Sequence, residues 1–175
     1  MAEPSRAPPG GLRVVLEVVG LAVIALVVAS AAGVAFVVGV ALSTLLWLLD
    51  LVPEPVLGAV GAVDPTFLLA MAVLSVVLIA PAEELLFRGA VQGRLRERFG
   101  AVPAVAGASL LFGSMHLVNF TGALAPTVAT ILLLAVVGAV YGAVYERTGN
   151  LVVPIAVHAT YNVVLLAGTY LGWTG

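Results

Sequence analysis

The chain has 175 residues, of which 62% are hydrophobic and 9% charged, and its formal net charge is −2. Soluble domains carry about 25% charged residues, so this composition excludes a globular protein with a polar surface and predicts a single integral membrane domain. The chain has no cysteine, which excludes disulfides, thiol nucleophiles and thiolate metal sites. Its small negative charge predicts no nucleic-acid partner.

The first predicted elements are a short tail and a long helix. Residues 1–11 are rich in Pro, Gly and Ala without an apolar period, which predicts a disordered N-terminal tail. Residues 12–175 are then expected to form one transmembrane domain. Residues 12–49 are almost wholly apolar and would make a helix of roughly 55 Å, longer than a bilayer core of about 30 Å. One long tilted helix is favoured over two short helices broken near Gly33, and a cleaved signal peptide is a third interpretation.

Four more spans are expected after a Pro- and Gly-rich loop at residues 50–65. The second span, residues 66–91, carries two adjacent glutamates and merges into a basic stretch. The others are expected at residues 101–118, 124–145 and 151–171. Gly149 is expected to end the fourth span as a left-handed cap. The predicted fold is therefore an all-α, polytopic transmembrane helix bundle with about five spans.

The arginines predict the orientation of this bundle. With five spans, the arginines before the first span, after the second and after the fourth fall on one side; these are Arg6, Arg13, Arg94, Arg96, Arg98 and Arg147. The acidic residues of the 50–65 loop fall on the other. The positive-inside rule then places the N-terminus in the cytoplasm and the C-terminus outside the cell membrane. A six-span arrangement would move the first arginines outside, which counts against it.

A few ionisable side chains interrupt the apolar spans, where each is a functional hypothesis because its burial in lipid is costly. They are Glu83, Glu84, Arg88, His116 and His158. At helical rise, Glu83 and His158 lie about 16 Å and 12 Å from the arginine-bearing interface, and His116 lies up to about 24 Å from it. If the third span is tilted or begins late, all three can meet around one cavity open to the cytoplasm.

Helical faces divide these residues into groups. Glu84 and Arg88 have the favourable i,i+4 spacing of an ion pair, whereas Glu83 points about 100° away and is free to face the cavity. His158 and Asn162 share a face by the same spacing. A lone membrane histidine more often bonds a neighbouring helix, and a Glu–Arg pair can be a structural clamp. The whole set on three helices favours a site.

Two chemistries fit this set of side chains. A carboxylate beside an imidazole can bind and deprotonate a water, and a second imidazole with an amide can donate hydrogen bonds to an oxyanion. This combination would hydrolyse an amide without a covalent intermediate. Alternatively, Glu83, His116 and His158 could bind a zinc ion and leave a position for water. The cofactor therefore stays open between none and Zn²⁺.

Other intramembrane protease classes are not supported by the sequence. Neither histidine begins an H-E-x-x-H pattern. Asp50 and Asp64 lie in the loop, whereas an aspartyl protease needs two aspartates within its spans. Residues 107–111 (GASLL) lack the closing glycine of the G-x-S-x-G pattern of serine hydrolases. The glutamate and histidine set thus remains the candidate.

Three motifs in this order resemble those of the CPBP family, which comprises CAAX prenyl endopeptidases and bacteriocin-processing or self-immunity enzymes. Residues 83–88 (EELLFR) resemble its E-E-x-x-x-R motif, residues 112–116 (FGSMH) its F-x-x-x-H motif, and residues 158–162 (HATYN) its H-x-x-x-N motif. The resemblance covers about residues 65–172. Each motif alone is weak, but the three in order are specific.

The resemblance implies a role for each of six residues. Glu83 would be the general base, and His116 would be its partner in activating water. His158 and Asn162 would donate hydrogen bonds to the oxyanion. Glu84 and Arg88 would orient the site. The implied activity is an intramembrane endopeptidase of the CAAX protease type, metal-free or zinc-dependent, acting on a peptide or protein substrate. The alternatives are a non-catalytic scaffold or self-immunity protein that binds a peptide in the same cavity, and a small transporter with a Glu/His proton relay, which would call for an internal repeat.

Overall fold

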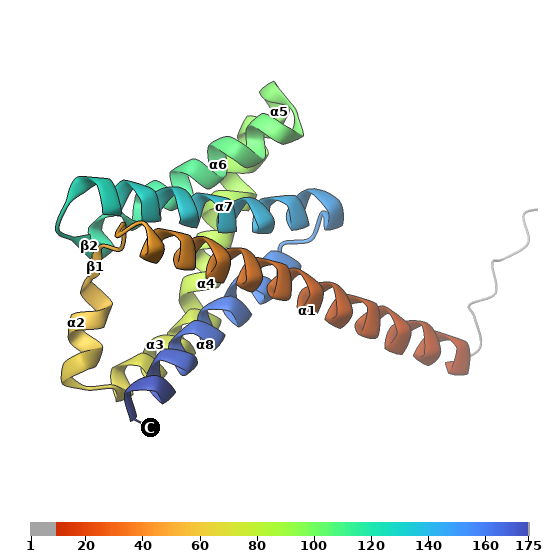
Figure 1. Ribbon diagram of the computed structural model, residues 1–175. Coiled ribbons are helices and arrows are strands. Elements are labelled where there is room, and N and C mark those ends of the chain that lie inside the picture. The colour runs from red at the N-terminus through yellow and green to blue at the C-terminus, as the bar shows by residue number, and fades with distance from the viewer. Residues whose placement is uncertain (1–9, 175) are drawn as a thin grey trace, which may run out of the picture.

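The computed structural model describes residues 10–174, and helices make up nearly all of them (Figure 1). Five stretches are long and apolar enough to cross a membrane, namely Gly11–Leu48, Thr66–Phe99, Ala101–Asn119, Leu124–Thr148 and Val152–Gly172. The predicted all-α bundle with five spans is confirmed. In chain order the elements are α1 (Gly10–Leu48), β1 (Glu54–Pro55), α2 (Val56–Val63), α3 (Thr66–Leu74), η1 (Ser75–Ile79), α4 (Ala80–Glu84), η2 (Leu85–Gln92), α5 (Gly93–Phe99), α6 (Ala101–Met115), η3 (His116–Asn119), β2 (Phe120–Thr121), α7 (Leu124–Thr148) and α8 (Val152–Thr174).

The first span is one uninterrupted helix, as favoured from the sequence. At 1.5 Å per residue, α1 is about 58 Å long. Its first half is exposed and extends beyond the bundle (Figure 1), whereas its second half packs on α7 and α8 and buries Ala32 and Ala35. Gly10 and Gly11, the last residues of the expected tail, are helical. Residues 1–9 lie outside the described part of the chain, so the tail stays a prediction there.

The second span is longer and less regular than predicted. It runs to Phe99 and includes the basic stretch that was expected to follow it. The short α4 lies between the π-helical segments η1 and η2. Pro81 in α4 has no N–H and would clash with the preceding turn of a regular helix, and a π-helical turn relieves that crowding. Glu83 and Glu84 therefore project from a short α-helical step between two widened segments.

The 50–65 loop carries secondary structure that was not predicted. β1 pairs antiparallel with β2, which lies in the expected turn between the third and fourth spans, and α2 follows β1. This two-stranded ribbon ties the α1–α2 connection to the α6–α7 connection. The Asp64 carboxylate accepts hydrogen bonds from the backbone N–H and the hydroxyl of Thr66, at 3.0 and 2.6 Å. These bonds hold the pKa of Asp64 below its ordinary value and fix the start of α3.

Helices α6 and α7 pack closely because glycines face the contact. A Cβ on Gly113 would lie 2.5 Å from the backbone oxygen of Ile131, so no larger residue fits there without a shift of α7. The core lies where α1, η2, α6, α7 and α8 meet, and it contains Phe87, Phe112, Leu133, Val137, Tyr141 and Val157. At its far end α7 stops at Gly149, whose φ of 61° confirms the predicted left-handed cap.

Candidate active site

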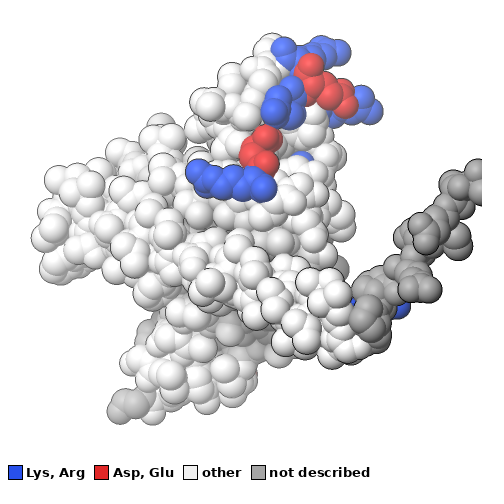
Figure 2. Space-filling model, turned by 90° about the vertical axis from the view of Figure 1, so that its right-hand side faces the viewer, with Lys and Arg blue, Asp and Glu red and all other residues white. Residues whose placement is uncertain are grey.

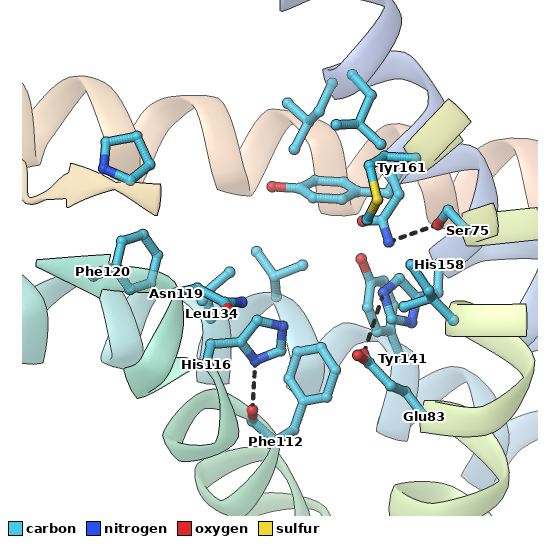
Figure 3. Close-up of a pocket in the computed structure, with 17 residues that line it drawn as sticks. Ser75, Glu83, Phe112, His116, Asn119, Phe120, Leu134, Tyr141, His158 and Tyr161 are labelled. Atoms are coloured by element: carbon cyan, nitrogen blue, oxygen red, sulfur yellow. Dashed lines mark hydrogen bonds and ion pairs between the residues drawn. The ribbon is translucent and has the colours of Figure 1, made fainter. Parts of the chain in front are cut away.

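One cavity collects the candidate residues from three parts of the chain. Glu83 of α4, His116 of η3, and His158 and Asn162 of α8 all line a cavity of about 440 Å³ (Figure 3). His116 had the least certain depth in the sequence, and it reaches the cavity because α6 ends at Met115 and a 3₁₀ turn begins there. The structure thus brings together the four predicted catalytic side chains.

The lining of this cavity reaches the two-stranded ribbon. Pro55 of β1 and Phe120 of β2 line the cavity, as do Leu165 and Leu166 near the end of α8. No arginine of the opposite end is among its lining residues. The opening to the cytoplasm stays a prediction, and the lining extends toward the ribbon. With the orientation predicted from the arginines, that direction is away from the cytoplasm.

Glu84 and Arg88 form an ion pair that is buried inside the protein. The Arg88 Nη1 donates to Glu84 Oε1 at 3.1 Å, and both side chains are fully buried. The predicted i,i+4 contact is therefore present. Glu84 Oε1 also accepts a hydrogen bond from His158 Nδ1 at 2.8 Å, which the sequence did not predict. Because Nδ1 carries the proton, His158 presents Nε2 to the cavity.

Arg88 begins a row of polar contacts between the second span and α7. The contacts join residues spaced by four on each helix: Arg88 to the Gly138 carbonyl at 2.6 Å, Gln92 to the Gly142 carbonyl at 3.1 Å, and Arg96 to the Glu146 carboxylate at 3.0 Å. Two of the acceptors are glycine carbonyls, and a Cβ on Gly142 would lie 2.8 Å from the Gln92 side chain. The row fixes the helix that carries both glutamates against α7.

Glu83 is placed differently from its neighbour. Its Oε2 lies 3.8 Å from His158 Nε2, beyond hydrogen-bond distance, and its side chain is 16% exposed. That oxygen is buried and has no hydrogen-bond partner among the described residues. A buried carboxylate oxygen is normally satisfied by a donor. Glu83 therefore lines the cavity, as its helical face predicted, and keeps an unused hydrogen-bond acceptor there.

His116 is oriented by the backbone of its own helix. Its Nδ1 lies 2.8 Å from the Phe112 carbonyl oxygen, which can only accept, so Nδ1 is the donor. In the neutral ring the other nitrogen, Nε2, then carries a lone pair and faces the cavity (Figure 3). The ring also packs against Phe112, with centroids 4.8 Å apart. Phe112 thus orients His116 both through its carbonyl oxygen and through its ring.

Asn162 is held by a residue that sequence reasoning missed. Its Nδ2 donates to the hydroxyl of Ser75 at 2.9 Å (Figure 3), and Ser75 is only 1% exposed. Ser75 lies in a long apolar run with no motif around it, so only its polarity within the second span could have indicated a role. Tyr141 and Tyr161 also line the cavity and were missed for the same reason.

The predicted zinc ligands do not form a metal site. Among residues 10–174, no three His, Cys, Asp or Glu side chains lie close enough together to hold a metal ion. Glu83 and His158 are near one another, but His116 approaches from across the cavity (Figure 3). The set of Glu83, His116 and His158 therefore does not fit the compact ligand sphere of zinc.

Comparison with known proteins gives one match. The family described as Rce1-like, type II CAAX prenyl endopeptidase Rce1-like, matches residues 65–164, which is more than half of the chain. No curated protein and no solved structure matches the chain. The matched region contains all three motifs and every side chain that forms the polar core of the cavity.

Proposed function

The chain belongs to the Rce1-like family of type II CAAX prenyl endopeptidases, as the resemblance to the CPBP family predicted, and from this premise we propose that it is a glutamate-dependent intramembrane endopeptidase. The observation that carries the proposal is that Glu83 lines the cavity while its buried Oε2 has no hydrogen-bond donor among the described residues. A carboxylate in that position suits the binding and deprotonation of a water molecule.

The proposed reaction is a direct attack of water on a peptide bond. Glu83 accepts a proton from a water that also donates to His116 Nε2, and the resulting hydroxide adds to the carbonyl carbon of the substrate. His158 Nε2, when protonated, and the amide of Asn162 donate hydrogen bonds to the oxyanion. Glu83 then returns its proton to the departing amine as the C–N bond breaks. Water is thereby divided between the two products.

Glu84 and Arg88 support this reaction without contact to the substrate. Glu84 fixes the ring orientation and tautomer of His158 through Nδ1, as an orienting carboxylate does in other hydrolases. Arg88 balances the charge of Glu84 within the bilayer. This division of labour explains why one glutamate of the pair is fully buried while the other reaches the cavity.

The test is peptide cleavage by the purified protein in liposomes. The substrates are a prenylated CAAX-type peptide and the same peptide without the prenyl group. We expect Glu83→Gln to lower kcat by at least about 10²-fold, because an amide cannot accept the proton of water. The matched control, Glu97→Gln, changes an exposed glutamate of α5 and should retain the wild-type rate. A Glu83→Gln protein with undiminished turnover would exclude the role of Glu83.

A chelator arm of the same experiment addresses the metal. Because Glu83, His116 and His158 form no three-ligand cluster, we expect a strong zinc chelator to leave the rate unchanged. Loss of activity that is restored by added zinc would contradict the metal-free mechanism.

A further inference from the structure

We propose that the hydroxyl of Tyr141 is a further catalytic donor, which binds the carbonyl oxygen of the substrate as it becomes an oxyanion. The inference rests on the proposed function and adds a residue that lies in none of the three motifs. Tyr141 belongs to α7, which contains no residue of the three motifs, and it lines the same cavity as Glu83 and His158.

The ring of Tyr141 is held rigidly at the base of the cavity. It is stacked on His158, with centroids 4.8 Å apart and planes at 20°, and it meets Phe112 edge-on at 6.2 Å. The guanidinium carbon of Arg88 lies 5.4 Å from the ring centroid. Tyr141 is only 1% exposed. A donor fixed in this way loses little conformational freedom when it binds a substrate.

The hydroxyl itself is not used by the protein. Figure 3 shows it pointing into the cavity, and no side-chain hydrogen bond of the described residues involves it. Six other hydroxyls of the spans are satisfied locally, by donation to the carbonyl four residues earlier: Thr44, Ser114, Thr127, Thr148, Thr160 and Thr169. The hydroxyl of Ser109 is the buried exception among the described residues, but Ser109 does not line the cavity. Because phenylalanine would pack equally well, a buried ring whose hydroxyl opens on the cavity without a protein acceptor indicates a ligand-binding role.

The site also needs another donor. One N–H of Asn162 is engaged by Ser75, and the Nδ1–H of His158 is engaged by Glu84. The donors expected from the motifs therefore offer one amide N–H and the Nε2 position of His158. Tyr141 stacks on His158 and lines the same cavity, so its hydroxyl adds a neutral donor to that cavity. No proton leaves Tyr141 in this role; it donates a hydrogen bond and keeps its O–H bond.

The decisive variant is Tyr141→Phe, which removes one oxygen and keeps the ring. We expect kcat to fall by about 10²-fold with KM little changed, because the lost bond strengthens only as the oxyanion forms. The matched control is Tyr145→Phe, one turn further along α7, half-buried and outside the cavity lining. It should keep the wild-type kcat. Equal kcat values for Tyr141→Phe and wild type would overturn the inference.

A binding experiment separates this inference from the proposed function. The probe is an apolar peptide with a phosphinate in place of one amide, which mimics the charged tetrahedral intermediate. Tyr141→Phe should bind it at least about 10-fold more weakly than the wild type, while the parent amide binds both equally. Equal phosphinate affinities, or no binding to the wild type, would overturn the role of Tyr141. If the wild type binds the phosphinate but cleaves no peptide, the endopeptidase proposal fails while the donor assignment stands.

Discussion

Glu84 is the residue on which the internal order of the site depends. One of its carboxylate oxygens accepts bonds from Arg88 and from His158, two residues that belong to different spans. Its other oxygen is buried without a partner among residues 10–174. A charge so enclosed by protein is stable only while its partners remain, because removing one partner leaves the other uncompensated.

The two adjacent glutamates should therefore differ in stability effects as well as in activity. We expect Glu84→Ala to lower the free energy of unfolding by about 3–5 kcal/mol, since Arg88 is left buried without its counter-charge. Glu83→Ala should change it by less than about 1 kcal/mol, because Glu83 makes no close ion pair within hydrogen-bond distance. Denaturant unfolding in detergent micelles measures both. Equal losses for the two variants would refute this division.

At the scale of single residues, local spacing predicted what lies on one helix. The Glu84–Arg88 contact and the Phe112–His116 contact both follow from i,i+4 spacing. Contacts between spans did not follow. Ser75 meets Asn162 only because α8 packs on the second span, and no property of a lone serine in an apolar run indicates which helix will lie beside it.

Helix α1 contributes to the site although it lies outside the family match. Tyr161 lines the cavity and packs against α1 at Gly39, where a methyl group would overlap its hydroxyl. Gly33 on the same helix has nothing within 4 Å of its Cβ position. The sequence of the first span suggested no role beyond spanning the membrane, because a glycine among alanines and valines carries no local signal.

These two glycines provide a matched pair of variants. We expect Gly39→Ala to destabilise the protein by about 1–3 kcal/mol, because Tyr161 is packed and cannot move freely. Gly33→Ala should be neutral or slightly stabilising, since alanine favours the helix. Adding Tyr161→Phe to Gly39→Ala removes the overlapping oxygen and should restore part of the loss. Thermal unfolding of the four proteins measures this, and equal melting of the two alanine variants would contradict the close packing.

At the scale of the whole molecule, most of the arginines lie at one end, and exposed acidic residues of the 50–65 loop lie away from them. Figure 2 shows the arginines gathered over α5 and the end of α7, with Glu97 and Glu146 among them and an otherwise uncharged surface below. The ribbon and α2 lie at the opposite side in Figure 1. This asymmetry supports the predicted orientation, in which the arginine-bearing end is cytoplasmic.

The orientation can be tested directly because the natural chain has no cysteine. We expect a membrane-impermeant maleimide to label Glu54→Cys, in the ribbon, on intact cells. Glu97→Cys, in α5, should react only after the membrane is permeabilised. Both positions are exposed. The reverse labelling pattern would place the arginines outside and the ribbon in the cytoplasm.

The sequence predicted the spans and missed the features that connect them. Long apolar runs fixed the five helices because lipid demands internally satisfied backbones. The ribbon was not predictable, since Glu54 and Thr121 form a two-residue pairing between distant parts of the chain. The widened turns around Pro81 were missed because a proline alone does not say whether a membrane helix kinks or relaxes.

The placement of Glu84 and Arg88 on one helix has a consequence for how the protein is made. A charged side chain at the middle of a membrane segment costs about 2.5–3.5 kcal/mol when the segment leaves the translocon. The second span emerges before α7 and α8 are synthesised. Gly138 and His158 are therefore not yet available as hydrogen-bond partners for its charged side chains. An arginine one turn after its glutamate can neutralise it within the nascent helix. Biogenesis can thus proceed in two stages, with ion pairing during insertion and capture of His158 only when the last helix arrives.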